Sequence, residues 1–123
     1  MKTILLALIC SVSLSVWGQS GKLKKADSYF NRLSYAYAAE LYEELIGSEV
    51  DSPALKSKLA YSYLKMDNYT KSVDYYSKMI ESSEAKPEDY YNYASVLKQI
   101  GNYGESDKWM NKYSNAAQAD LRS

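Results

Sequence analysis

The sequence predicts an all-α fold: an N-terminal signal peptide followed by a right-handed α-solenoid of three helix–turn–helix repeats. The first observation behind this prediction is a spacing of 34 residues that several columns of residues share. Self-similarity at a fixed period of about 20–50 residues is typical of stacked repeats. The second is that small and aromatic residues keep fixed offsets within each period, as two packed helices require. The columns are Ala26, Ala60 and Ala94; Tyr35, Tyr69 and Tyr103; Pro53 and Pro87; Ala38, Ser72 and Ser106; and Tyr42, Tyr76 and Met110.

Residues 1–18 have the layout of a secretory signal peptide. Lys2 supplies the positive start, residues 4–9 are an unbroken apolar run, and the small residue Gly18 precedes Gln19. The alternative is an uncleaved membrane anchor, which needs about 20 apolar residues. Serines interrupt this stretch before that length is reached. We therefore expect cleavage, export to the periplasm, and a position there or at the outer membrane.

Composition excludes several classes of function. Cleavage after Gly18 leaves 105 residues, enough for one small domain, with 14 basic against 15 acidic side chains. Such a balance offers no basic surface for nucleic acid or for an anionic membrane. Histidine is absent, and the single cysteine, Cys10, lies in the leader behind the bulky Ile9, where a lipoprotein signal has a small residue. We expect no disulfide, no metal site and no cofactor.

The three repeats are expected at 19–52, 53–86 and 87–123. Pro53 and Pro87 suit the first turn of a helix, and Ser52 is a good N-cap. Ser34, Asn68 and Asn102 are N-capping types, and Gly101 suits the left-handed position that ends a helix. The first helices are predicted at Lys22–Leu33, Pro53–Met66 and Pro87–Ile100, and the second helices at Tyr35–Ile46, Tyr69–Ser82 and Tyr103–Ala117.

Small residues at fixed positions predict where paired helices approach closely. Ala60 should face the second helix of its repeat, and Ser72 should face the first. The fourteen tyrosines fall mostly on periodic positions, so we interpret them as half-buried packing residues whose hydroxyls reach water.

The columns resemble the tetratricopeptide repeat. The second repeat carries the small, aromatic and apolar residues of that family in order: Ala60, Tyr63, Asp67, Tyr69, Ser72, Tyr76 and Met79. The sequence departs from the family where Lys22 and Lys56 replace a large apolar residue, and where Val50 and Glu84 replace proline. The resemblance implies a protein-interaction module without an active site.

A narrower resemblance concerns the leader and the first repeat. A signal peptide ending before glutamine and then ADSYFNRLSYAYAAELYEELI are similar to the start of OmpA-family envelope proteins of Gram-negative bacteria. Nothing in the sequence resembles the propeller or the peptidoglycan-binding domain of those proteins. The alternative functions are therefore a docking module of a larger outer-membrane or secretion assembly, or a truncated N-terminal part of such a protein.

Family geometry implies a concave groove lined by the first helices. Its mixture of apolar and polar residues suits an extended or helical peptide from another envelope protein. Leu23, Ala54, Glu88 and Gln99 share the groove-facing positions. The partner-binding groove is expected to contain Asp27, Phe30, Asn31, Ser57, Tyr61, Leu64, Lys65, Tyr91, Ser95 and Lys98, with Phe30, Tyr61, Leu64 and Tyr91 as anchors.

Two further surfaces are considered. The last helix carries Trp109, Tyr113 and other apolar residues with no polar helix after it, so it is expected to expose a terminal edge that docks onto a partner. Glu40, Glu43 and Glu44 gather on one predicted helix, and paired carboxylates can carry out hydrolysis. We interpret that cluster as a solvated face and predict no catalytic residue.

Cleavage of the leader is directly testable. Mass spectrometry of the protein isolated from the periplasm should show Gln19 at the N-terminus. Recovery of a chain that begins at Met1 from the cytoplasm would contradict the predicted export.

Overall fold

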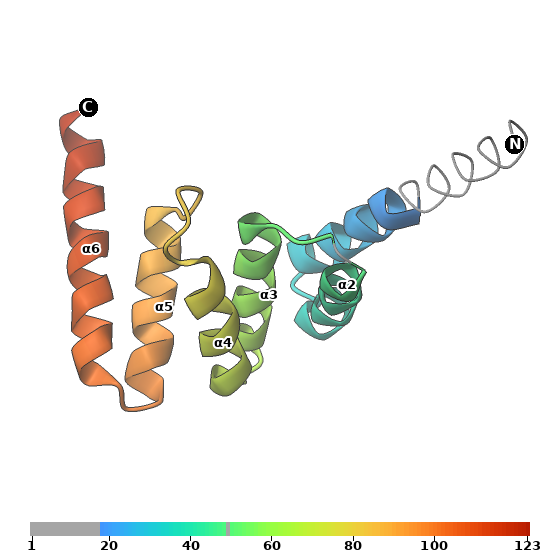
Figure 1. Ribbon diagram of the computed structural model, residues 1–123, viewed down its shortest axis with the longest axis horizontal. Helices are drawn as coiled ribbons and strands as arrows, with labels where there is room; N and C mark the ends of the chain where they lie inside the picture. The colour runs from blue at the N-terminus through green and yellow to red at the C-terminus, as the bar shows by residue number, and fades with distance from the viewer. Residues whose placement is uncertain (1–17, 49) are drawn as a thin grey trace, which may run out of the picture. The chain divides into compact units, whose positions relative to one another are not determined.

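The computed structural model describes residues 18–48 and 50–123. The predicted signal peptide, residues 1–18, lies outside these residues except for Gly18. Within the described ranges the chain is all α, with six helical segments in consecutive pairs. It divides into two compact units, one ending at Val50 and the other beginning at Asp51 (Figure 1).

The first unit contains helical residues 18–31 and α2, Tyr35–Gly47. Polar contacts join the two: the Tyr42 hydroxyl donates to the Asp27 carboxylate, and the Lys22 ammonium lies 3.0 Å from the Glu44 carboxylate. Lys22, which stands where the tetratricopeptide pattern has an apolar residue, is thus used in an ion pair. Glu44, from the acidic cluster, is its partner.

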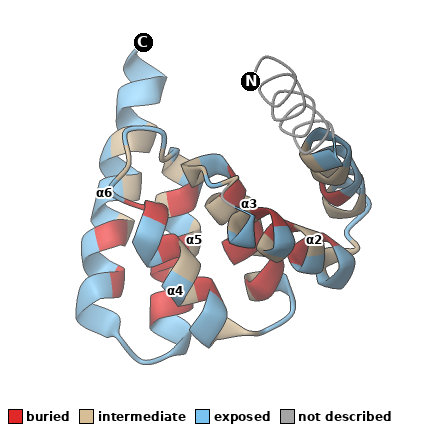
Figure 2. Ribbon diagram, turned by 45° about the vertical axis from the view of Figure 1, so that its right-hand side comes forward, coloured by how far each residue is buried: buried red, intermediate tan, exposed pale blue. Residues whose placement is uncertain are grey.

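The second unit contains α3 (Pro53–Lys65), α4 (Tyr69–Met79), α5 (Pro87–Gln99) and α6 (Tyr103–Arg122). Each of these helices packs against the next along the chain (Figure 1). Figure 2 shows buried residues, in red, on these helices. The core that they form combines aromatic, aliphatic and small side chains. Its buried members are Ala60, Tyr76, Met79, Ile80, Tyr93, Ala94, Val96, Leu97 and Trp109.

The predicted close approach of paired helices is confirmed in the second unit. Ala60 has no exposed surface, and its carbonyl oxygen accepts a 2.8 Å hydrogen bond from the Ser72 hydroxyl. One period later the Ser106 hydroxyl donates to the Ala94 carbonyl at 2.7 Å. Each serine is therefore small enough to admit the neighbouring helix and polar enough to bond to its backbone.

Each first helix ends in the same hydrogen-bonded turn. The backbone N–H groups of Ser34, Asn68 and Asn102 donate to carbonyls five residues earlier, at 2.8, 2.9 and 2.8 Å. This pattern places the preceding residue in the left-handed region. Gly101 adopts φ +83° there, as predicted, whereas Leu33 and Asp67 adopt φ +63° and +58° without glycine's freedom.

Two of the predicted N-caps make a side-chain bond. Ser52 accepts from the Leu55 N–H at 3.1 Å, and Asn68 accepts from the Lys71 N–H at 3.3 Å. Ser34 and Asn102 occupy the N-cap position without a side-chain capping bond. At these two helix starts the turn itself, rather than the cap, defines where the helix begins.

The predicted boundaries differ from the structure by three residues or more at three helix ends, and by one or two residues at four others. Gly18 to Gly21 are already helical, before the expected start at Lys22. Helix α4 ends at Met79 and not at Ser82, because Ser82 accepts from the Glu84 N–H at 3.1 Å within a turn. Helix α6 continues to Arg122, past the expected end at Ala117, because residues 118–122 contain no glycine or proline to stop it.

The close approach at Ala60 yields a test of packing. Ala60→Leu should destabilise the protein by about 1–3 kcal/mol, because the larger side chain overpacks the contact with α4. The matched control is Ala54→Leu, since Ala54 is exposed on the same helix. Urea unfolding of both variants should show the loss for Ala60→Leu alone. Equal stability of the two variants would place Ala60 on the wrong face.

Candidate interaction groove

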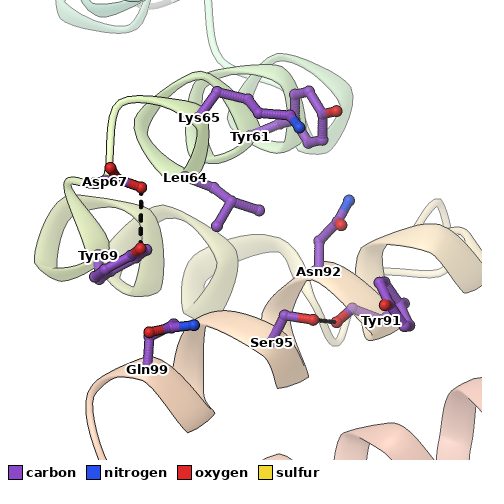
Figure 3. A pocket seen from close by; sticks show the side chains of 9 residues that line it. All are labelled: Tyr61, Leu64, Lys65, Asp67, Tyr69, Tyr91, Asn92, Ser95 and Gln99. Carbon is purple, nitrogen blue, oxygen red and sulfur yellow. Dashed lines mark hydrogen bonds between the residues drawn. The ribbon is translucent and has the colours of Figure 1, made fainter.

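A groove of about 600 Å³ lies between α3 and α5 in the second unit (Figure 3). Leu64 of α3 and Asn92 of α5 point into the gap between the two helices. Tyrosine, leucine, amide and hydroxyl groups therefore share one surface. The lining residues are Tyr61, Leu64, Lys65, Asp67, Tyr69, Tyr91, Asn92, Ser95 and Gln99.

Five of the predicted partner-binding residues line this groove: Tyr61, Leu64, Lys65, Tyr91 and Ser95. Two more lie on the same helices outside its lining. Ser57 stands one turn before Tyr61 and donates a hydrogen bond to Asp89, whereas Lys98 is exposed beside Gln99.

The remaining three predicted residues belong to the first unit. Asp27 accepts the hydrogen bond from Tyr42, and this bond, after burial, raises the pKa of the Tyr42 hydroxyl. Phe30 packs edge-on against Tyr35, with ring centroids 5.6 Å apart. Asn31 is exposed at the end of its helical segment. Asp27 and Phe30 thus take part in the packing of their own helix pair.

The prediction missed Asp67, Tyr69 and Asn92. Asn92 could have been found, because it shares a helical stripe with Ser95 and Gln99 at steps of three and four. Tyr69 was interpreted as packing alone. Its hydroxyl donates to Asp67 at 3.0 Å, and this bond is the main cause of the raised pKa of Tyr69.

Contacts hold the groove side chains in place. The Lys65 ammonium lies 5.4 Å from the centre of the Tyr61 ring, a cation–π distance. Ser95 donates to the Tyr91 carbonyl at 2.9 Å. The Tyr91 ring packs at 5.2 Å against Tyr113 of α6. Tyr91 keeps nearly half of its surface exposed, so it presents an ordered aromatic ring to solvent.

The predicted terminal edge was wrong at Trp109. Its side chain is 3% exposed and packs against Tyr90 and Tyr93, with ring centroids 5.8 and 5.6 Å away. Trp109 follows Ser106 by three residues and so shares its inward face. Tyr113 is half-buried against Tyr91.

The outer face of α6 is polar, and the ammonium of Lys112 lies 4.4 Å from the centre of the Trp109 ring. Exposed residues of this helix include Asp107, Lys108, Asn111, Ser114, Asn115 and Gln118. The apolar Leu121 remains exposed in its last turn. A polar face of this kind solvates the end of the second unit.

The part of the chain that the structure describes holds no group of three acidic, histidine or cysteine side chains placed to bind a metal ion. Among the same residues, no helix combines the length and the apolar character that crossing a membrane requires.

Comparison with solved structures identifies the fold. The chain is similar to the C-terminal part of a TPR repeat-containing protein from Cytophaga hutchinsonii, with a TM-score of 0.71 and 20% sequence identity. This chain has the fold of tetratricopeptide repeats. The match covers 80% of this chain and 40% of the Cytophaga chain, so it spans less than half of that protein. No protein-family profile matches the sequence, and no curated protein matches it significantly.

One buried group behind the groove is unpaired. The Tyr76 hydroxyl has no hydrogen-bond partner among the described residues. Burial and then the nearby charge of Asp89 raise its pKa; the Asn92 amide partly offsets this rise without the geometry of a hydrogen bond. The Tyr42 hydroxyl, at the same position of the first repeat, is bonded to Asp27. The second repeat has Tyr61 in place of that aspartate, so Tyr76 lacks the corresponding carboxylate.

This contrast predicts opposite effects of one substitution. Tyr76→Phe should leave stability unchanged or raise it by about 1 kcal/mol, because it removes an unpaired buried hydroxyl. Tyr42→Phe should cost about 1.5–3 kcal/mol, since it removes a hydrogen bond to a carboxylate. Thermal unfolding followed by circular dichroism measures both. A loss for Tyr76→Phe as large as that for Tyr42→Phe would show that Tyr76 is bonded.

Proposed function

We propose that this protein is a non-enzymatic interaction module that binds a peptide segment of another envelope protein in the groove between α3 and α5. The observation that carries the proposal is the lining of the groove. Aromatic and aliphatic side chains from two helices meet amide and hydroxyl groups in a groove of about 600 Å³. Grooves of that composition suit peptides, which present apolar side chains and a polar backbone together.

The groove side chains divide the work of recognition. Tyr61, Leu64 and Tyr91 offer apolar surface on which a partner's side chains can be buried, and such anchors carry most of the energy at protein interfaces. Asn92 and Gln99 each present an amide donor and an amide acceptor, which match a peptide backbone. Lys65 and Asp67 carry opposite charges. The groove therefore does not favour a strongly acidic or a strongly basic peptide.

The envelope location is part of the proposal. It is supported by the leader-like residues 1–18 and by the resemblance of the first repeat to OmpA-family envelope proteins. The burial of Trp109 argues against the alternative in which an exposed terminal edge docks onto a larger assembly.

Crosslinking from defined positions tests the groove. A benzoylphenylalanine placed at Tyr91 should crosslink a protein in intact envelopes. The same group at Tyr103 should not, although Tyr103 is the more exposed of the two at 63%. Tyr61→Ala in the Tyr91-crosslinking protein should weaken capture by about 30-fold or more, because a central anchor contributes about 2 kcal/mol.

A second arm of the experiment compares the captured proteins. A pull-down with the wild type should capture at least one protein that a pull-down with the Tyr61→Ala plus Tyr91→Ala variant does not capture. An identical set of captured proteins in both samples, or equal crosslinking from Tyr91 and Tyr103, would overturn the proposed groove.

A further inference from the structure

One hydrogen bond joins α3 directly to α5 near the start of both helices. The Ser57 hydroxyl of α3 donates to Oδ1 of Asp89 in α5. The other carboxylate oxygen, Oδ2, accepts from the backbone N–H of Lys86 at 2.9 Å. Asp89 is 4% exposed. Both oxygens of a buried carboxylate are thus bonded, one to the neighbouring helix and one to its own helix start.

The bond lies one helical turn away from both walls of the groove. Tyr61 follows Ser57 by four residues, and Asn92 follows Asp89 by three, so each lies on the same helix face as the bonded residue before it. Tyr61 and Asn92 line the groove from α3 and α5 respectively. A fixed distance between Ser57 and Asp89 therefore constrains the distance between the two groove walls.

Energetics argue that this bond has a geometric role. A buried carboxylate is expensive to desolvate, and an apolar pair of similar size often stabilises a protein equally well. At the corresponding sequence positions one repeat earlier, both residues are apolar: Leu23 and Leu55. Apolar side chains slide against one another, whereas a hydrogen bond to a carboxylate fixes distance and angle.

We propose that Asp89 is a positioning residue: its bond to Ser57 sets the separation of α3 and α5 and hence the width of the groove. The consequence for binding rests on the proposed function. The separation itself belongs to the free protein and can be measured without any partner, so the two proposals can fail independently.

Spin-label distances measure that separation. The full chain with Cys10→Ser has no other cysteine, so labels can be attached to introduced cysteine pairs. One pair replaces Ala54 and Glu88, exposed at the end of the helices where the bond lies, and the other replaces Lys65 and Lys98 at the opposite end. Ser57→Ala should lengthen and broaden the distance distribution of the first pair more than that of the second. Ser57→Thr, which keeps the hydroxyl, should restore the original distribution.

Ser72→Ala is the matched control. It also removes a serine hydrogen bond between helices, but that bond lies within one helix pair, from α4 to the Ala60 carbonyl. It should lower the melting temperature and leave the Ala54–Glu88 distribution unchanged. If Ser57→Ala fails to fold, Asp89→Ala serves instead, because it removes the acceptor of the Ser57 hydroxyl from the other helix; the same lengthening is expected.

An Ala54–Glu88 distribution in Ser57→Ala identical to that of the parent would overturn the positioning role. So would an equal change in Ser72→Ala, because Ser57 would then act only through general stability. A positive distance result with no crosslink from Tyr91 would keep the positioning role and remove the peptide-binding function.

Discussion

Helices of one pair in the second unit approach so closely that a serine hydroxyl reaches the carbonyl oxygen of an alanine on the other helix. This contact requires a residue with almost no side chain on one helix and a short polar one on the other. Because α4 packs against α3 in this way, its other buried residues, including Tyr76 and Met79, reach the core shared with α5. The α3–α4 pair therefore offers α5 an apolar surface to pack against.

The connecting turns add a second constraint. Three first helices end with the same backbone hydrogen bond, so the second helix of each pair begins at the same offset from its partner. Leu33 and Asp67 accept a left-handed backbone at these turns, although a residue with a Cβ pays a cost there. The hydrogen bonds of the turn evidently outweigh that cost, because the same geometry recurs with leucine, aspartate and glycine at one position.

Polar groups distinguish repeats whose apolar pattern is nearly the same. The first pair carries a tyrosine–carboxylate bond between Tyr42 and Asp27. In the second pair, the corresponding hydroxyl of Tyr76 has no hydrogen-bond partner among the described residues. A hydrogen bond from Ser57 to Asp89 connects α3 to α5. These differences between the repeats leave the helical fold unchanged and alter which polar groups each repeat carries. The proposed binding groove therefore occupies a place where the repeats differ and not where they agree.

Periodicity determined the helical fold, the helix pairs and the alanine–serine contacts. The resemblance to tetratricopeptide repeats indicated five residues that line the groove in the structure: Tyr61, Leu64, Lys65, Tyr91 and Ser95. A helix places residues three and four apart on one face, so the face of Tyr61, Leu64 and Lys65 follows from spacing without knowledge of the partner. Only the tertiary structure decided that Trp109 is covered by Tyr90 and Tyr93, that Asp89 bonds to Ser57, and that the Tyr76 hydroxyl has no hydrogen-bond partner among the described residues. Each of these outcomes depends on which atoms of another helix lie opposite and how far away they are. A periodic pattern along one helix contains neither piece of information.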